Sequence, residues 1–139
     1  MTVFLDTAVL MYAAGGAHPL RDPCRRVLRQ VADGELEAVT SAEVVPEILH
    51  RYTRIGRAAT GAALARASLD LLAPVPPLTH ALMRRLPDLV ERYPDHAARD
   101  LVHVATCLHE GIREIISPDR GFDGVDGIRR IDPADFAAA

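Results

Sequence analysis

"VFLDTAVLMY", residues 3–12, places one carboxylate, Asp6, directly after a short apolar run. The run is typical of a buried strand, and the residues from Thr7 onward suit the start of a helix. Two interpretations of Asp6 are open. Aspartate is a good N-cap residue, so it can simply begin that helix. In an α/β sheet, however, ligands bind beyond the carboxyl ends of the strands, and there Asp6 is placed to hold a metal ion.

Length and composition predict one domain over residues 1–139, because 49% hydrophobic residues can build a core without metal or disulfide staples. No apolar run reaches the ~18 residues of a membrane span, and no basic segment precedes an apolar one at the N-terminus. We therefore expect a cytoplasmic protein with no membrane association. Cys24 and Cys107 have no zinc-site spacing and are expected to be buried thiols.

Short apolar runs alternate with helical patterns along the chain. Strands are predicted at residues 2–5, 37–39, 114–117 and 129–131, with a candidate edge strand at 73–79. Helices are predicted at residues 22–32, 40–55, 58–72, 79–93 and 97–110, with a kink or boundary at Pro87. This alternation predicts an α/β fold, with a central, mostly parallel sheet flanked by helices.

A second acid stands in the helix "HAARDLVHVATCLHEG", residues 96–111. Apolar residues at helical spacing form its core-facing stripe: Leu101, Val104, Ala105 and Leu108. Asp100 lies only about 40° from Val104 around the helix, at the edge of the stripe and near the N-terminus. It is either a first-turn acid favoured by the helix dipole or a member of a site.

A third acid follows the strand in "EIISPDRGFDG", residues 114–124. The strand runs into Pro118-Asp119, so a second strand ends at a carboxylate. Proline, aspartate and Gly121 together are also ordinary turn chemistry. Asp123 repeats the pattern and is more typical of a turn or cap residue.

Two glutamates compete for the fourth place in "VTSAEVVPEILHRY", residues 39–52. Thr40 and Glu43 match a capping box, in which the glutamate reaches back to the N-cap amide. That pattern gives Glu43 a local role. Glu47 has none, although it stands beside the apolar residues Val44 and Ile48.

Together the acids predict a shared site, since two strand ends and two helices would deliver carboxylates to one rim of the sheet. Two carboxylates ~5 Å apart repel by roughly 3 kcal/mol at an effective dielectric of ~20. A hard divalent ion relieves that repulsion, and Mg²⁺ or Mn²⁺ prefers oxygen ligands and binds phosphate oxygens.

At these residues the sequence resembles the PIN-domain family, in particular the VapC-type toxin ribonucleases of bacterial toxin–antitoxin pairs. "FLDTAVLMY" resembles the opening motif, "TSAEVVPEIL" the second with its acid at Glu47, "ARDLVHVATCLHEG" the third with Asp100, and "IISPDRGFDGVDGI" the fourth with Asp119. The four motifs occur in order over nearly the whole chain.

The resemblance implies a three-layer PIN-like fold, Mg²⁺ or Mn²⁺, hydrolysis of RNA phosphodiester bonds, a small antitoxin partner and a homodimer. Two residues depart from the family pattern. Pro46 is expected to remove a helical hydrogen bond and reorient Glu47, and Pro118 stands where the family often has a small polar residue.

The expected chemistry is metal-assisted hydrolysis, in which the ion lowers the pKa of a water and polarises the scissile phosphate. Asp6, Asp100 and Asp119 are the expected metal ligands, Glu47 would orient the attacking water, and Thr7 would add a hydroxyl contact.

The stretch from His50 to Arg66 contains four arginines and no acid. Arg51, Arg54 and Arg57 are the closest of them to Glu47 in sequence, and we expect them to hold the RNA backbone despite the net charge of −3. A solvated helix face and a groove for the antitoxin are the alternatives.

Two other functions remain open on the sequence. The chain could be a non-catalytic PIN-like binding or regulatory module, or a metal-dependent phosphatase or DNA nuclease that uses the same carboxylates. A metal requirement would separate the first from an enzyme, and a comparison of substrates would separate the second from a ribonuclease.

Overall fold

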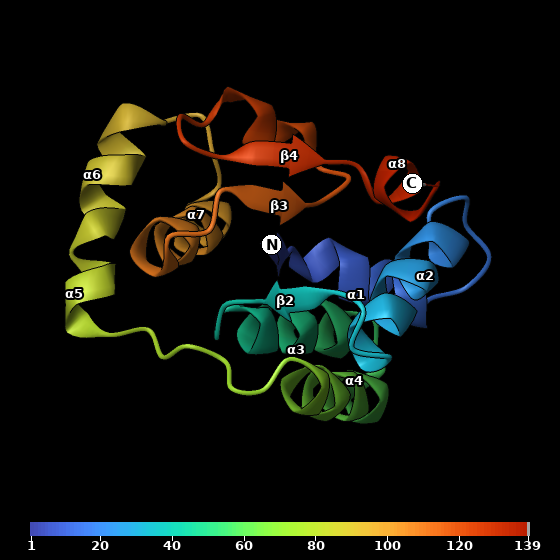
Figure 1. The fold of residues 1–139 in the computed structure, drawn as a ribbon. Helices are drawn as coiled ribbons and strands as arrows, with labels where there is room; N and C mark the ends of the chain where they lie inside the picture. Colours follow the sequence, from blue (N-terminus) through green and yellow to red (C-terminus); the bar gives the residue numbers. More distant parts are fainter. Residues whose placement is uncertain (139) are drawn as a thin grey trace.

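We describe residues 1–138 of the chain in a computed structural model (Figure 1). The strands are β1 Thr2–Leu5, β2 Glu37–Val39, β3 Glu114–Ile116 and β4 Arg129–Ile131. The helices are α1 Thr7–Ala14, α2 Arg21–Ala32, α3 Val44–Arg54, α4 Ala58–Leu71, α5 His80–Met83, α6 Arg85–Arg92, α7 Ala98–Glu110 and α8 Pro133–Ala138, with a 3₁₀ helix, η1, at Arg120–Gly124. None of the described helices combines the length and the apolar character that a bilayer crossing requires.

The four strands form one sheet in the order β2-β1-β3-β4, and each of its three pairings is parallel. The chain adds β2 on one side of β1 and later crosses over to place β3 on the other side. The gap between the carboxyl ends of β1 and β3 is therefore a topological switch point, where open α/β sheets bind their ligands. The Asp6 amide donates to the Ile116 carbonyl at 3.1 Å and holds these two strand ends together.

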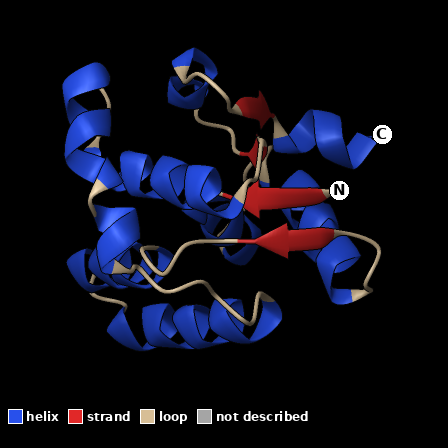
Figure 2. Cartoon of the chain, turned by 60° about the vertical axis from the view of Figure 1, so that its left-hand side comes forward, coloured by secondary structure: helices blue, strands red, loops and turns tan. Residues whose placement is uncertain are grey.

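Helices cover both faces of the sheet, so the expected three-layer α/β fold is confirmed (Figure 2). Along β1, Val3 and Leu5 enter one core, whereas Phe4 enters the other. The first core contains buried residues of α1, α2, α3 and α4, and the second contains those of α7 and η1 with α6 packed against them. Helices from opposite layers, α3 and α7, can thus both reach the rim at the strand ends.

Helix α7 is buried more completely than its apolar stripe predicts. Every residue from Leu101 to Cys107 is buried, because the helix packs on the sheet and is itself covered by α5 and α6. The helix ends at Glu110 and is capped by Gly111, whose φ of 71° lies in the left-handed region that glycine adopts without strain. Cys107 on this helix and Cys24 on α2 are both free and buried, as expected.

The predicted capping box at the start of α3 does not form. The helix begins at Val44, and the Ser41 hydroxyl accepts the Glu43 amide at 2.9 Å. The Thr40 hydroxyl instead donates to the Leu5 carbonyl at 2.9 Å and ties the end of β2 to β1. Because that partner lies on another strand, local sequence spacing could not reveal it.

Pro46 does not disrupt α3, contrary to expectation. It lies in the first turn, where backbone amides have no partner within the helix. The next amide, that of Glu47, already bonds to the Glu43 carbonyl at 3.2 Å.

One further segment differs from its prediction. Residues 73–79 form an irregular loop rather than an edge strand, because their prolines at 74, 76 and 77 remove the donors a ladder needs. The predicted helix 79–93 has the predicted break near Pro87, since it is divided at Arg84 into α5 and α6. The ring of Pro87 would clash with the carbonyl four residues earlier, at Met83, and α5 ends at that residue.

Candidate active site

Asp6 stands at the switch point, directly after β1, and is 5% exposed. Its Oδ2 accepts a hydrogen bond from the Ser117 hydroxyl at 2.7 Å. Its Oδ1 lies 3.7 Å from Nε2 of His103. Although Asp6 occupies the N-cap position of α1, its side chain makes no capping hydrogen bond. The side chain of Asp6 therefore does not act as a helix cap.

Asp119 approaches Asp6 from the end of β3. The Ser117 hydroxyl that donates to Asp6 also accepts the Asp119 amide at 3.0 Å, so one serine connects the two acidic segments. Asp119 itself caps η1, with Oδ1 accepting the Gly121 amide at 2.8 Å. Sequence reasoning missed Ser117, although a hydroxyl between a strand and a Pro-Asp turn is a recognisable signal.

Glu47 enters the site from α3, and two donors converge on one of its oxygens. Oε1 accepts the Thr7 hydroxyl at 3.0 Å and lies 2.6 Å from Nε2 of His103. The same Nε2 is 3.1 Å from the Thr7 hydroxyl oxygen. We expected Thr7 to contact substrate, but its side chain is 1% exposed and its hydroxyl is directed to Glu47.

His103 is the site residue that the sequence reasoning missed. It lies one turn after Asp100 on α7 and is 0% exposed. Its ring is tilted against Phe4 with the ring centres 5.2 Å apart. Its Nδ1 is buried and has no hydrogen-bond partner within residues 1–138. A polar residue among the buried positions of an apolar helix was the available signal.

Asp100 completes the group from the first turn of α7. Burial, together with the negative charges of Asp6 and Asp119, raises its pKa to about 6. Burial likewise raises the pKa of Asp6, with Glu47 adding to the shift while His103 and Ser117 oppose it. Carboxyl groups crowded in this way bind a proton or a cation more readily than isolated ones do.

Glu47 and His103 form a coupled pair. Burial alone would raise the pKa of Glu47, but its hydrogen bond to His103 and the charge of that ring lower it. Burial would lower the pKa of His103, yet the hydrogen bond to Glu47 and the nearby carboxylates raise it. The pair therefore favours an ionised Glu47 that accepts the proton on Nε2.

The donor set fits a hard divalent cation. Asp6, Asp100 and Asp119 could supply carboxylate oxygens, and the raised pKa values of Asp6 and Asp100 mean that a nearby cation would favour their ionised forms. No three acidic, histidine or cysteine side chains among residues 1–138 are already arranged as a complete ligand cage. Mg²⁺ does not require one, because it keeps several waters and is usually held by one or two carboxylates.

Glu43 and Asp123 lie beside this group with partners of their own. Glu43 Oε1 is 3.8 Å from Nε of Arg99, and burial with the charge of Glu47 raises the Glu43 pKa. Asp123 Oδ1 accepts from Nε of Arg130 at 2.7 Å.

Arginines line two hollows beside α3, and one of these hollows reaches Glu47. One of about 490 Å³ is lined by Met11, Glu47, His50, Arg51, Arg54, Ile55 and Arg99. A second of about 500 Å³ shares Met11, Arg51 and Ile55 with the first and extends to Arg57. The arginines expected to hold substrate therefore line a surface that reaches Glu47, and Arg99 joins them from α7.

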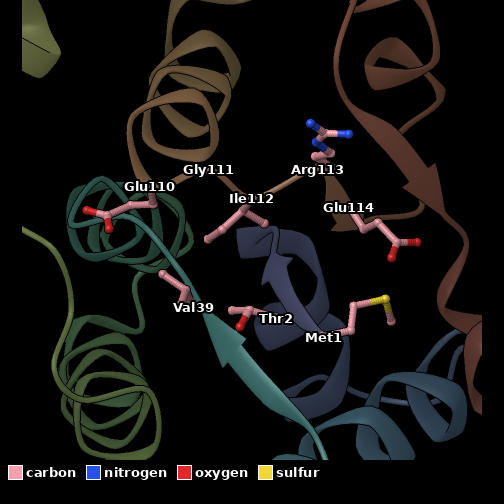
Figure 3. Close-up of a pocket in the computed structure, with 8 residues that line it drawn as sticks. All are labelled: Met1, Thr2, Val39, Glu110, Gly111, Ile112, Arg113 and Glu114. Carbon is pink, nitrogen blue, oxygen red and sulfur yellow. The ribbon is translucent and has the colours of Figure 1, made fainter.

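A different hollow, of about 520 Å³, lies beside the first residues of β1 (Figure 3). Glu110 at the end of α7 and Glu114 at the start of β3 stand on opposite sides of it. None of the four motif acids lines it. This hollow is therefore separate from the candidate site at the carboxyl ends of the strands.

Comparisons with known proteins agree with this arrangement. Residues 3–128 match the PIN domain family. VapC ribonuclease Mb1869c of Mycobacterium bovis is 33% identical over 129 residues, which is 93% of this chain and 98% of the relative.

Two solved structures share the fold, both with a TM-score of 0.73. VapBC2 of Rickettsia felis, bound to a DNA fragment from its promoter, is 15% identical, and the match covers 95% of this chain and 98% of that one. Mycobacterium tuberculosis VapC20, described as a Sarcin-Ricin loop cleaving toxin, is 18% identical, and the match covers 91% and 98%. The family match over residues 3–128 and the VapC ribonuclease that is 33% identical over nearly the whole chain show that this chain belongs to the PIN-domain family, among the VapC ribonucleases.

Proposed function

We propose that the chain is a metal-dependent endoribonuclease that acts as the toxin of a type II toxin–antitoxin pair. The observation that carries the proposal is the convergence of Asp6, Glu47, Asp100 and Asp119 at the switch point of a PIN-type sheet. Relatives that match nearly the whole chain are named ribonucleases, and PIN-domain ribonucleases depend on a metal ion.

Asp6, Asp100 and Asp119 would hold the ion, which we assign as Mg²⁺ or Mn²⁺ because every donor is a carboxylate oxygen. When bound, the ion would supply positive charge to the scissile phosphate and make a nearby water easier to deprotonate. Ser117 fixes Oδ2 of Asp6 and leaves Oδ1 for this role.

Glu47 would act as the general base. Thr7 and His103 occupy Oε1, and no hydrogen bond among the described residues engages Oε2. Oε2 is therefore the atom we expect to take the proton from the attacking water as it approaches the phosphorus atom. The water oxygen would bond to phosphorus while the bond from phosphorus to the 3′ oxygen breaks. The upstream fragment would then leave with a 3′-hydroxyl, and the phosphate would stay on the 5′ end of the downstream fragment.

Arg51, Arg54 and Arg57 would hold the phosphates on either side of the cleaved bond. All three are exposed, and they line the hollows that run from Glu47 along α3. Guanidinium groups bind phosphate through paired hydrogen bonds, so a row of them can offset the net negative charge of the chain.

The same proposal extends to partners and location. A toxin of this family would be held inactive by a small antitoxin protein in the cytoplasm and would act as a homodimer. The support is the similarity to VapC proteins, one of them in a VapBC complex and one described as a toxin.

The test is cleavage of end-labelled RNA by the purified chain with Mg²⁺, with Mn²⁺ and with excess chelator. We expect cleavage with either ion, none in chelator, and fragments with 5′-phosphate and 3′-hydroxyl ends. Asp100→Asn should be inactive under every condition. Full cleavage by extensively chelated protein, or a 2′,3′-cyclic phosphate on the upstream fragment, would contradict the proposed chemistry.

Parallel assays separate the alternatives. DNA of the same sequence and a small phosphomonoester, offered with the same ions, should remain intact. Cleavage of either in preference to RNA would indicate a DNA nuclease or a phosphatase. Tight RNA binding that is indifferent to metal and never followed by cleavage would indicate a binding module.

A further inference from the structure

His103 does not belong to the set of acids that the proposed reaction requires, yet it lies at their centre. Nε2 is 2.6 Å from Glu47 Oε1, 3.1 Å from the Thr7 hydroxyl and 3.7 Å from Asp6 Oδ1. The side chain is fully buried, so it cannot touch a bound RNA. Any effect on the reaction must pass through its neighbours.

Only one of the two ring nitrogens, Nε2, makes polar contacts. Nδ1 has no partner within the described residues, and the tilted contact with Phe4 sets the plane of the ring. Burying a polar ring without a full set of partners costs free energy. The favourable polar contacts of the ring are all made by Nε2, the atom that lies beside Glu47.

The hydrogen bonds at Glu47 determine which oxygen remains free. Thr7 of α1 and His103 of α7 lie in helices on opposite sides of the sheet, and both hold the same carboxylate oxygen of Glu47 on α3. A carboxylate held at Oε1 can rotate little, and Oε2 is then aimed in one direction. Groups that orient a reacting side chain in this way commonly change rates by 10–100-fold without touching substrate.

We infer that His103 is a positioning residue that, together with Thr7, fixes Oε1 of Glu47 and thereby directs Oε2 toward the reacting water. The inference rests on the proposed ribonuclease function. It excludes a purely structural role, in which the ring only fills the space between α7 and β1.

A pair of substitutions separates the two roles. His103→Gln retains an amide N–H close to the place of Nε2, and it loses nothing at Nδ1, which has no partner. His103→Met keeps the length of the side chain and removes the donor. His109→Met is the matched control, because His109 lies on the same helix and is exposed.

We expect His103→Met to lower kcat by at least ~10-fold with KM for RNA changed less than about twofold. His103→Gln should recover most of that loss, and His109→Met should have no effect. In a Glu47→Gln background, His103→Met should cause less than about a twofold further loss, because residues that act through one group are not additive.

A second measurement does not depend on activity. The same double-mutant cycle is run on the free energy of unfolding in chelator. His103→Met and Glu47→Gln should be non-additive there, as expected for residues in direct contact.

Additive effects in that cycle would show that the two side chains do not interact and would overturn the inference. Coupling in unfolding, combined with equal rate losses in the wild-type and Glu47→Gln backgrounds, would assign His103 a structural role only. A wild-type chain that cleaves no RNA with any ion would instead refute the proposed function, whatever the cycle shows.

Discussion

Glu47 and Glu43 lie one helical turn apart but face different partners. Glu47 accepts from Thr7 and His103, whereas Glu43 faces Arg99 at 3.8 Å. Glu47→Gln keeps an oxygen for both donors but cannot act as a base, so we expect cleavage to fall by ~10²-fold or more. Glu43→Gln should change the rate less than about fivefold, because a half-exposed ion pair is worth ~0–1 kcal/mol.

Initial rates of RNA cleavage by the two variants, with melting curves as a check on folding, would measure this difference. If Glu43→Gln were the inactive variant and Glu47→Gln retained its rate, the assignment of the base would be wrong.

Asp100 should make the metal-free protein sensitive to pH. Folding raises its pKa from 3.8 to about 6, chiefly through burial, so the folded chain binds this proton more tightly than the unfolded chain does. Its contribution to stability is therefore most favourable below the unfolded pKa and is lost as the pH rises toward about 6. Above that value the ionised Asp100 destabilises the fold.

Asp100→Asn removes this penalty. In chelator above pH 6 the variant should melt higher than the wild type by ~2–4 °C, since solvent screening reduces the effect to ~1 kcal/mol. Below pH 4 the two should converge. Added Mn²⁺ should stabilise the wild type more than the variant, because binding to the folded state alone raises stability. A large drop in the melting temperature of Asp100→Asn would make Asp100 a structural residue.

The sequence predicts the four carboxylates because strand ends and helix first turns follow from local periodicity. His103 was missed because it lies outside the predicted apolar stripe of α7, and it is buried by contacts with Phe4 and Glu47 from distant parts of the chain. Thr40 was misassigned because its acceptor, the Leu5 carbonyl, is set by strand pairing. Contacts between distant segments, which complete the candidate site, are not encoded in any short window.

At the scale of elements, α3 and α4 are joined by a close contact at Gly61. An added Cβ there would lie 2.5 Å from the Cβ of Tyr52 on α3, closer than real side chains approach. Gly61→Ala should therefore destabilise the protein by ~1–3 kcal/mol, even though alanine favours a helix by ~1 kcal/mol over glycine.

The urea midpoint measures this effect, with Gly16→Ala as a control because nothing lies within 4 Å of a Cβ added there. An unchanged or higher midpoint for Gly61→Ala would show that the two helices can separate without cost.

The bounds of helices and strands were predictable where local sequence signals determine them. The strand Glu37–Val39 was predicted with its exact bounds, and α4 differs from its prediction by a single residue. The beginning of α3 was not predicted, because hydrogen bonds of Thr40 and Ser41 fix it. The loop at residues 73–79 was wrongly predicted as a strand, because it pairs with no strand of the sheet. The short α8 was also missed, although Asp132 and Pro133 are favourable residues at its start.

At the scale of the whole molecule, RNA binding must work against the net charge of −3 through a local row of arginines. In chelator, with Asp100→Asn as the inactive background, Arg51→Gln and Arg54→Gln should each weaken binding of single-stranded RNA. Each should also lower the slope of log K against log salt by about 0.7.

Arg66→Gln is the matched control, because Arg66 is exposed in the same stretch of sequence but lines neither hollow beside the acids. Equal losses for all three variants would indicate a diffuse effect of charge rather than a defined path for the backbone.

The sheet order also divides the site between two parts of the chain that meet only late in synthesis. Asp6, Thr7 and Glu47 precede the loop at residues 73–79, whereas Asp100, His103 and Asp119 follow it, and the pairing of β1 with β3 joins the two parts. The first part is synthesised before β3. A growing chain would therefore carry only half of the proposed catalytic carboxylates. If these groups act as proposed, the chain would gain the ability to hydrolyse RNA only once β3 has paired with β1.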